Sequence, residues 1–319
     1  MKIGIIGIGK HGSRYAGHIV NDFSDLDLVA ISRRSAVGKK QAKEWNCRYY
    51  RDWRDLISAK DVDAVISVVP PSLNLDIARV CAAAKKALLL EKPLAAGRVA
   101  GEAIVALFQK SAIPLTVAQT LRYNSIVTGL KKNIHRVGKL YSFSASHRLE
   151  PSTLKWLEDS EEAGAGVILH TAVHMFDALR YITGCNIVRV RASRFQVHNP
   201  HLEDLFTAQM EMENGVIGTV DSSKVGKART GRYEFVGAEG ELHADQIHGR
   251  LEFIHHADIE PLVHDGLGGT IVPLLQDWID YLEGKRENPI SGGEGLAALR
   301  VCAACLESAQ KDDWVDIYS

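Results

Sequence analysis

The sequence predicts a two-domain α/β protein whose N-terminal part is a Rossmann domain with a doubly wound parallel sheet. Three observations predict it. A glycine-rich stretch, GIGKHG, follows an apolar strand at the N-terminus. Apolar strand-like runs and helical segments then alternate over roughly the first 120 residues, as parallel sheets with crossover helices require. Later segments alternate between apolar and polar residues, as half-buried strands do.

The overall composition excludes several classes of function. The chain has 319 residues, enough for two domains of ordinary size, with 46% hydrophobic and 24% charged residues. Lys and Arg number 38 against 39 Asp and Glu, so no excess of charge favours nucleic acid or an anionic membrane. We expect a small-molecule substrate, no nucleic acid and no membrane partner.

The cysteines and the N-terminus predict a reduced, cytoplasmic protein. The five cysteines are an odd number, scattered through a chain too long to need disulfides: Cys47, Cys81, Cys185, Cys302 and Cys305. The last two form a CxxC within a helical apolar stripe, which favours core packing over redox chemistry. The first residues, MKIGIIGIGKHG, lack an apolar run long enough for a secretory signal or a membrane span.

The N-terminal glycines predict a dinucleotide site. Gly7, Gly9 and Gly12 have GxGxxG spacing between a strand and a helix, and this context makes the motif much more specific. Gly7 permits the tight turn, Gly9 lets the backbone approach a pyrophosphate, and Gly12 allows close contact between helix and sheet. The N–H groups of the helix start then hold the phosphates, and we assign Lys10 and His11 to the same site.

The next strand, LDLVAISRR, predicts which dinucleotide is preferred. NAD would call for a carboxylate near its end to bind the ribose hydroxyls, but Ser32, Arg33 and Arg34 stand there instead. Guanidinium groups pair bidentately with phosphate, so these residues favour the 2′-phosphate of NADP over NAD. The alternative is that both arginines are solvated surface residues.

Further strands place more residues at the same edge of the sheet. VDAVISVVPP (62–71) and KKALLLEKP (85–93) are typical of buried parallel strands, and IPLTVAQTLRYN (113–124) indicates another. Ligands bind at the carboxyl ends of the strands in such sheets. The residues that we assign to the cofactor there are Pro70, Glu91 and Lys92.

The second half of the chain predicts antiparallel strands. KLYSFSASH and NIVRVRAS alternate between apolar and polar residues. Asn214-Gly215, between FTAQMEME and VIGTV, is a strong signal for a hairpin. We expect the boundary between the two domains near Leu121, with 1–121 in the first and 122–319 in the second.

Several motifs together resemble one known family. The glycine loop, VVPPS, Glu91-Lys92-Pro93 and the later segment WLEDSEEAGAGVILHTAVHMFD occur in that order, as in the Gfo/Idh/MocA family, which includes glucose-fructose oxidoreductase and inositol dehydrogenase. The resemblance spans nearly the whole chain. It implies a C-terminal α/β domain on a large, mostly antiparallel open sheet that binds substrate, and a homodimer or homotetramer formed through that sheet.

The stretch AGAGVILHTAVHMFD places His170, His174 and Asp177 at i, i+4 and i+7. If it is helical, all three side chains point the same way. They could bind zinc, transfer protons beside a cofactor, or form a polar helix face. In the family, His174 matches the catalytic histidine and Asp177 the second of two aspartates, so no metal is needed to explain them. His170 departs from the family, because it stands where the first aspartate usually lies.

The resemblance implies a mechanism of alcohol oxidation. His174 would accept the hydroxyl proton while hydride leaves the carbinol carbon for the nicotinamide, and Lys92 would hydrogen-bond the reacting oxygen with a pKa lowered by its surroundings. Glu91 and Pro93 would shape the loop. His170 would relay the proton, contact a different substrate such as an anionic one, or mark a site that has lost catalysis.

A further set of residues is assigned to the substrate through the resemblance, each with a structural alternative. The set consists of Arg122, Tyr123, His147, Arg148, Trp156 and Asp177. Arg122 and Tyr123 could instead form a hinge, and His147 and Arg148 could end a surface strand. Trp156 could cap the pocket or pack in the core, and packing is favoured.

The motifs together predict an NAD(P)-dependent oxidoreductase. Its substrate would be a secondary alcohol of a sugar, cyclitol or related polyol, or the matching ketone. Two alternatives occur in the same family: a non-catalytic dinucleotide-binding regulator, and an NAD-dependent glycoside hydrolase. Lys92 and His174 favour the dehydrogenase, whereas His170 keeps the regulator open.

Overall fold

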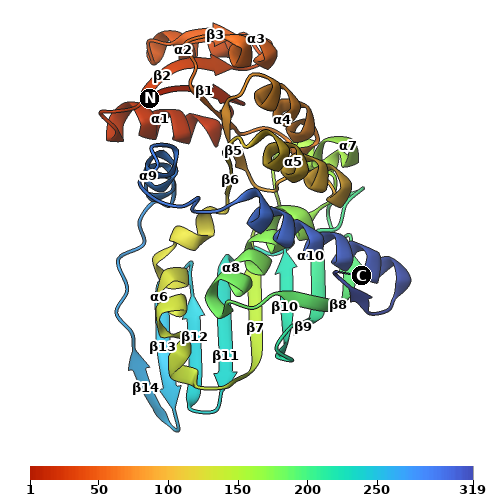
Figure 1. Cartoon of the computed structure of the whole chain (residues 1–319). Helices are drawn as coiled ribbons and strands as arrows, with labels where there is room; N and C mark the ends of the chain where they lie inside the picture. Colours follow the sequence, from red (N-terminus) through yellow and green to blue (C-terminus); the bar gives the residue numbers. More distant parts are fainter. Residues whose placement is uncertain (319) are drawn as a thin grey trace. The chain divides into compact units, whose positions relative to one another are not determined.

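The computed structural model of the protein describes residues 1–318 and divides into two compact units. The first unit contains Met1–Gln119 and Ile271–Leu296, and the second contains Thr120–Thr270 and the residues from Ala297 onward. Figure 1 shows the elements of both, coloured along the sequence.

The first unit is a Rossmann fold with a six-stranded parallel sheet in the order β3-β2-β1-β4-β5-β6. Its strands are β1 (Lys2–Ile6), β2 (Asp27–Ser32), β3 (Arg48–Tyr50), β4 (Ala64–Ser67), β5 (Ala87–Glu91) and β6 (Leu115–Ala118). Its helices are α1 (Gly12–Asp22), α2 (Val37–Glu44), α3 (Trp53–Ser58), α4 (Asn74–Ala83), α5 (Arg98–Ser111) and α9 (Ile271–Leu282). The order changes direction beside β1, so the glycine loop that follows β1 lies at the switch point where such sheets bind ligands.

The central strands are apolar because both faces of a parallel sheet are covered by helices. Every residue of β4 is buried, and so is every residue of β5 except the half-buried Ala87. The predicted strand over 113–124 is much shorter in the structure, where β6 ends at Ala118 and a 3-10 turn takes Thr120–Tyr123. The cause is a tight bend in which the N–H of Gln119 donates to the carbonyl of Val117.

The second unit is built on a nine-stranded sheet, in the order β14-β13-β12-β11-β7-β10-β9-β8-β15. Only β7 and β10 pair in parallel, and the other neighbours are antiparallel. The strands are β7 (Leu140–Arg148), β8 (Ile187–Phe195), β9 (Leu205–Met212), β10 (Ile217–Ser223), β11 (Thr230–Gly237), β12 (Gly240–Asp245), β13 (Arg250–His255), β14 (Asp258–Pro261) and β15 (Val315–Asp316). The predicted fold class is therefore confirmed for both domains.

Helices lie on one face of this sheet, as Figure 1 shows for α6 and α8. The helical segments of the unit are α6 (Ser125–Asn133), α7 (Ser160–Ala163), a π-helical turn over Ile168–Ala172, α8 (Val173–Thr183) and most of α10 (Gly292–Lys311). Phe206 and Val220 are buried, whereas Thr207 and Thr219, next to them in β9 and β10, are exposed. Association of copies through the exposed polar face stays a prediction.

The hairpin predicted at Asn214-Gly215 is confirmed. It joins β9 to β10, and Gly215 has a φ of +79°, a conformation that favours glycine. The Asn214 side chain accepts a hydrogen bond from the N–H of Val216. Local turn chemistry thus accounts for the position of this hairpin.

The division of the chain differs from the predicted domains in one respect. The break at Gln119 lies two residues from the expected one, but 271–296 belongs to the first unit and not to the second. The physical reason is the edge of β6. Asn288 donates to the carbonyl of Leu115 and accepts from the Thr116 hydroxyl, and the N–H of Val117 donates to Ile290, so the returning segment satisfies strand groups that would otherwise lack partners.

The five cysteines are free thiols, as predicted. Cys302 and Cys305 are buried in α10, and burial raises the pKa of the Cys305 thiol far above its ordinary range. Both observations fit core packing. Among residues 1–318, no helix is both long enough and apolar enough to span a membrane.

Candidate active site

The glycine loop leaves room for a ligand at one of its three glycines and is closed at the other two. A Cβ on Gly7, where φ is +90°, would lie 2.1 Å from the carbonyl oxygen of Val68, and one on Gly12 would lie 2.2 Å from that of Gly7. A Cβ on Gly9 would meet nothing within 4 Å. The open space at Gly9 fits the close approach of a pyrophosphate, as predicted.

The start of α1 supplies hydrogen-bond donors beside this space. His11 precedes the helix, and its side chain makes no capping hydrogen bond to the first turn. The N–H groups of Ser13 and Arg14 donate to the carbonyls of Gly9 and His11, and the helix start as a whole attracts anions. Lys10 is exposed next to them, and the buried Ser32 contributes its carbonyl oxygen, which accepts from the N–H of Gly7. These features together fit a bound dinucleotide.

The two arginines after β2 have different environments. Arg33 is half-buried, and its Nη1 donates to the carbonyl of Ile8 at 2.7 Å and to Oε1 of Gln41 at 2.9 Å. Arg34 is exposed. Arg33 is thus held against the glycine loop, so the alternative of a freely solvated side chain does not describe it.

Glu91 joins the glycine loop to the end of β5. Its buried carboxylate accepts hydrogen bonds from Nε2 of His11 at 2.8 Å, from the Tyr15 hydroxyl at 2.7 Å and from the N–H of Lys92 at 3.0 Å. His11, which we had assigned to the cofactor, therefore also anchors the loop. The predicted shaping role of Glu91 has a concrete form here, because one carboxylate holds both the helix start and the backbone of Lys92.

The charge state of Glu91 follows from these contacts. Burial raises the pKa of this carboxyl, but the hydrogen bond and charge of His11, the charge of Lys92 and the Tyr15 hydrogen bond together lower it below its ordinary value. Burial and the nearby Glu91 charge raise the pKa of Tyr15 well above its ordinary value. At neutral pH the cluster therefore contains a carboxylate and a neutral phenol that donates to it.

The loop after Lys92 is held from the opposite side by Asn74. This buried side chain begins α4 and donates from Nδ2 to the carbonyls of Pro93 and Leu94, both at 3.2 Å. The peptide bond between Lys92 and Pro93 is cis. Pro70, the other residue predicted at this edge, is half-buried in the segment that leads from β4 to α4. Lys92 therefore sits between two anchored segments.

In the second unit, the predicted helix face is divided among different neighbours. Ile168–Ala172 forms a π-helical turn, and the α-helix begins only at Val173. A π-turn changes the rotation between successive side chains, so the α-helical spacing on which we based a common face does not apply across it. His170 lies in the π-turn, whereas His174 and Asp177 lie in α8.

His170 is nearly buried and contacts the segment before it. Its Nε2 lies 2.9 Å from the carbonyl oxygen of Ala163, and its ring packs edge-to-face with Trp156 at 5.3 Å between centroids. A carbonyl can only accept, so Nε2 carries a proton. While that bond stands, this nitrogen does not accept a proton, which weighs against a relay through it. Trp156 packs on His170, in agreement with the favoured packing role.

His174 lies beside the end of β7. Its ring is half-buried and 6.5 Å from the ring of His147, the last buried residue of that strand. Arg148 comes next in β7 and points away, because successive side chains of a strand alternate between faces. It pairs bidentately with Asp221 at 2.7 and 2.8 Å in an exposed position. His147 therefore lies near His174, and Arg148 lies at the surface. Their predicted contacts with substrate stay predictions.

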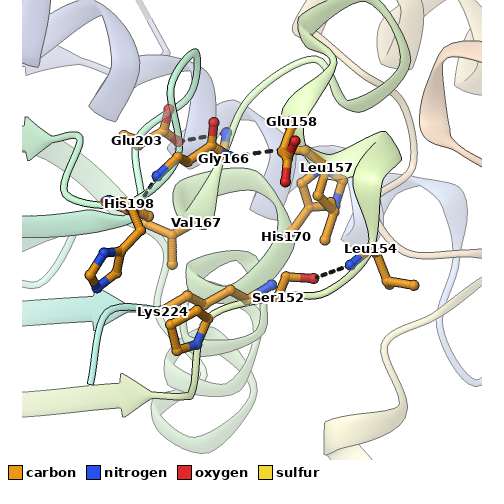
Figure 2. A pocket seen from close by; sticks show the side chains of 13 residues that line it. Ser152, Leu154, Leu157, Glu158, Gly166, Val167, His170, His198, Glu203 and Lys224 are labelled. Carbon is orange, nitrogen blue, oxygen red and sulfur yellow. Dashed lines mark hydrogen bonds between the residues drawn. The ribbon is translucent and has the colours of Figure 1, made fainter. Parts of the chain in front are cut away.

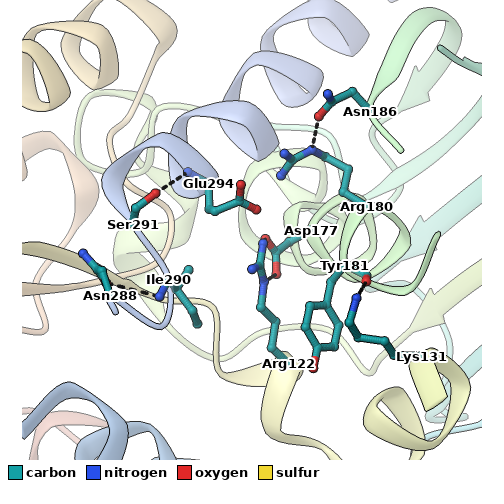
Figure 3. Close-up of polar contacts among 10 residues, drawn as sticks. All are labelled: Arg122, Lys131, Asp177, Arg180, Tyr181, Asn186, Asn288, Ile290, Ser291 and Glu294. Atoms are coloured by element: carbon teal, nitrogen blue, oxygen red, sulfur yellow. Dashed lines mark hydrogen bonds and ion pairs between the residues drawn. The ribbon is translucent and has the colours of Figure 1, made fainter. Parts of the chain in front are cut away.

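Asp177 forms a buried ion pair and does not present a free carboxylate. Its two oxygens accept from Nη2 and Nε of Arg122 at 2.6 and 2.8 Å (Figure 3), and its side chain is 0% exposed. Arg122 also lies over the ring of Tyr181. The ion pair ties the turn Thr120–Tyr123, where Tyr123 is half-buried, to α8. Pairing of two buried charges is the physical reason. Binding of substrate by either residue stays a prediction.

A pocket of the second unit is lined in part by the π-turn (Figure 2). His170, Glu203, His198 and Lys224 contribute polar groups to its lining, and Leu154 and Val167 contribute apolar surface. Burial raises the pKa of Glu203, although its Oε1 accepts from the N–H groups of Gly166 and Ile168. Glu203 thus caps the start of the helical segment, and His170 lies in the wall of a cavity.

Three positioning residues were missed from the sequence. Tyr15 could have been found, because a tyrosine on a buried helix face needs a hydrogen-bond partner for its hydroxyl. Asn74 and Glu203 carry no comparable signal, since a polar residue at a helix start or in a loop is ordinarily solvated. Among residues 1–318, no three His, Cys, Asp or Glu side chains are grouped so as to hold a metal ion.

Comparisons with known proteins show the family to which the chain belongs. Residues 1–119 match the model of the oxidoreductase family GFO_IDH_MocA, NAD-binding Rossmann fold, and residues 131–317 match the C-terminal alpha/beta domain of the same family. The chain belongs to the Gfo/Idh/MocA family. The resemblance found in the glycine loop, in Glu91-Lys92-Pro93 and in the histidine segment is thereby confirmed.

Relatives within the Gfo/Idh/MocA family match over most of their length. An uncharacterized oxidoreductase of Bacillus subtilis is 24% identical, covering 96% of this chain and 93% of its own. Myo-inositol 2-dehydrogenase of Thermotoga maritima is 26% identical, and the match covers 77% of this chain and 76% of the relative. A solved levoglucosan dehydrogenase in complex with NADH and levoglucosan has a TM-score of 0.90 at 22% identity and covers 100% of both chains, which shows that the fold is shared.

The Glu91 cluster makes a pH-dependent contribution to stability. Because the folded pKa is below the ordinary value of 4.5, this contribution is fully present above that value and is lost as pH falls through the folded pKa. We expect Glu91→Gln to lower stability near neutral pH by about 1–3 kcal/mol, with the difference from wild type shrinking in acid. Melting temperatures between about pH 3 and 8 measure it.

The matched control for this experiment is Glu102→Gln, which removes a charge at an exposed i,i+4 pair with Arg98 in the same unit. It should change stability by less than about 0.5 kcal/mol. A Glu91 variant as stable as this control at neutral pH would contradict the anchoring role.

The ion pair between Arg122 and Asp177 should be essential for the stability of the second unit. Removing one partner leaves the other charge buried, so we expect Asp177→Asn to cost about 3–5 kcal/mol in denaturant unfolding. Asp221→Asn, which breaks the exposed pair with Arg148, should cost less than about 1 kcal/mol. If the two substitutions lowered the free energy of unfolding equally, burial of the Arg122–Asp177 pair would make no contribution to stability.

Proposed function

We propose that the protein is a dehydrogenase that uses NAD or NADP and acts on a secondary alcohol of a sugar, cyclitol or related polyol, or on the matching ketone. The observation that carries the proposal is the Glu91 cluster, which anchors Lys92 directly beside a glycine loop with open space at Gly9. Relatives named myo-inositol 2-dehydrogenase and levoglucosan dehydrogenase support the substrate class.

The dinucleotide would be held by the first unit. Gly9 and the uncapped start of α1 would receive the pyrophosphate, and Ser32, Arg33 and Arg34 the ribose end. When bound, the nicotinamide accepts or supplies the hydride. Lys10, Pro70 and the backbone of Lys92 would border it.

In alcohol oxidation, the substrate loses a hydride from its carbinol carbon and a proton from its hydroxyl, and becomes a ketone. His174 would accept that proton, and Lys92 would donate a hydrogen bond to the same oxygen and stabilise the charge that develops on it. Ketone reduction reverses these steps. His147, whose ring neighbours that of His174, would help to orient the substrate.

NADP is favoured over NAD in this proposal. The end of β2 supplies Arg33 and Arg34, and no acidic residue occurs among Ser32, Arg33, Arg34 and Ser35 to bind the ribose hydroxyls. Arg33 keeps a fixed position at the glycine loop through Ile8. A guanidinium placed there can pair with a 2′-phosphate.

The roles of Lys92 and His174 are tested by substitution. We expect Lys92→Ala and His174→Ala to lower turnover by about 10²–10⁴-fold, because each removes a group that acts on the reacting oxygen. Reduction of NADP or NAD is followed at the nicotinamide absorbance with a panel of polyols, and oxidation of the reduced form with ketoses. His256→Ala, in an exposed turn, is the control.

Other outcomes of the same assay identify the rival functions. Tight dinucleotide binding without turnover on a broad panel would favour a regulator, and glycoside cleavage without net change in the nicotinamide would favour a hydrolase. Turnover that survives both substitutions would refute the proposed roles.

The dinucleotide preference is tested by fluorescence titration with NADPH and NADH. We expect wild type to bind NADPH more tightly than NADH. Arg33→Ala should raise the dissociation constant for NADPH by about 10–100-fold, because a charge-assisted pair is lost. The dissociation constant for NADH should change by less than about threefold. Lys110→Ala, at the far end of α5, controls for lost positive charge.

A further inference from the structure

Gln41 connects the arginine that follows β2 to both sides of the glycine loop. Its Oε1 accepts from Nη1 of Arg33 at 2.9 Å, and its Nε2 donates to the hydroxyl of Ser13 at 3.1 Å. The same Nη1 donates to the carbonyl of Ile8. Since Ile8 lies within the loop and Ser13 lies in the first turn of α1, the three side chains Arg33, Gln41 and Ser13 span the phosphate-binding turn.

Packing holds the helix that carries Gln41 close to Arg33. A Cβ on Gly38, in the first turn of α2, would lie 2.4 Å from the ring of Tyr49 and 3.1 Å from Cβ of Arg33. The Tyr49 hydroxyl donates to the carbonyl of Arg33 at 2.9 Å. The backbone of Arg33 is thus fixed by Tyr49, and its side chain is fixed by Gln41 and Ile8.

The charge of Arg33 is not neutralised by these contacts. Both acceptors of its Nη1 are neutral oxygens, and within residues 1–318 no carboxylate forms an ion pair with it. A guanidinium has five N–H donors, and a phosphate takes two of them in a bidentate pair. Neutral acceptors on one nitrogen therefore orient the group while leaving its charge and its other edge for an anion.

We propose that Gln41 is a positioning residue that sets the dinucleotide preference by orienting Arg33. This inference rests on the proposed dinucleotide site and adds a determinant outside the glycine motif and outside the strand end. A preoriented guanidinium does not lose side-chain freedom when it pairs with the 2′-phosphate, so its orientation should raise affinity for NADPH selectively. The ribose of NADH offers no such anion.

The test compares dissociation constants for NADPH and NADH in Gln41→Leu, measured by fluorescence titration without substrate. We expect this variant to bind NADPH about five- to twentyfold more weakly, and its dissociation constant for NADH to change by less than about twofold. Gln41→Glu should weaken binding of NADPH at least as much, because the new carboxylate neutralises Arg33. Gln109→Leu, the same change at an exposed position of α5, should leave both constants unchanged.

A double substitution separates orientation of Arg33 from a general structural role. If Gln41 acts through Arg33, then Arg33→Ala combined with Gln41→Leu should bind NADPH as Arg33→Ala does alone. A further loss in the double variant, or equal weakening of NADPH and NADH in Gln41→Leu, would overturn the proposal. Melting temperatures of all variants identify any that fail to fold. If Gln41→Leu fails to fold, Gln41→Glu takes its place in the comparison with wild type.

These outcomes are distinct from failure of the proposed function. The titration contains no substrate, so absence of turnover does not affect it. Binding of neither dinucleotide by wild type would reject the proposed site and this inference together. A wild-type preference for NADH would contradict only the cofactor assignment, because the Gln41 effect is judged by the change in the ratio of the two constants.

Discussion

The buried carboxylate of Glu91 is the interaction on which the first unit's site depends. It accepts from His11 and Tyr15 at the start of α1 and from the backbone of Lys92 at the end of β5. A carboxylate in such a position is stable only because several donors replace the water it has lost. The phosphate-binding turn and the loop that carries Lys92 are therefore held by one group, and neither can shift without leaving buried donors or charge unsatisfied.

The second unit uses the same physical solution at different places. Arg122 and Asp177 neutralise one another in the interior and join a 3-10 turn to α8, while Glu203 caps the π-turn that precedes this helix. His174 follows in the first turn of α8. In each unit, a buried acidic residue has a structural role.

The contacts of His170 are ones that an aspartate at the same position could not make. An aspartate at this position could not donate to the carbonyl of Ala163, whereas the imidazole does so through Nε2 and packs its ring on Trp156. Compared with an aspartate, the imidazole supplies a hydrogen-bond donor and an aromatic contact in place of a negative charge. The ring of His147 lies beside that of His174.

The sequence by itself determined the features that depend on neighbours in the chain: the Rossmann strands from apolar runs, the dinucleotide loop from the spacing of Gly7, Gly9 and Gly12, and the hairpin at Asn214-Gly215. Tertiary structure decided the pairing of Glu91 with His11, 80 residues away, and of Asp177 with Arg122, 55 residues away. Tertiary structure also decided that residues 271–296 belong to the first unit, and that a π-turn precedes His174. Backbone preference and periodicity are local properties, but the partner of a buried polar group depends on which distant segment the completed fold brings within hydrogen-bonding distance.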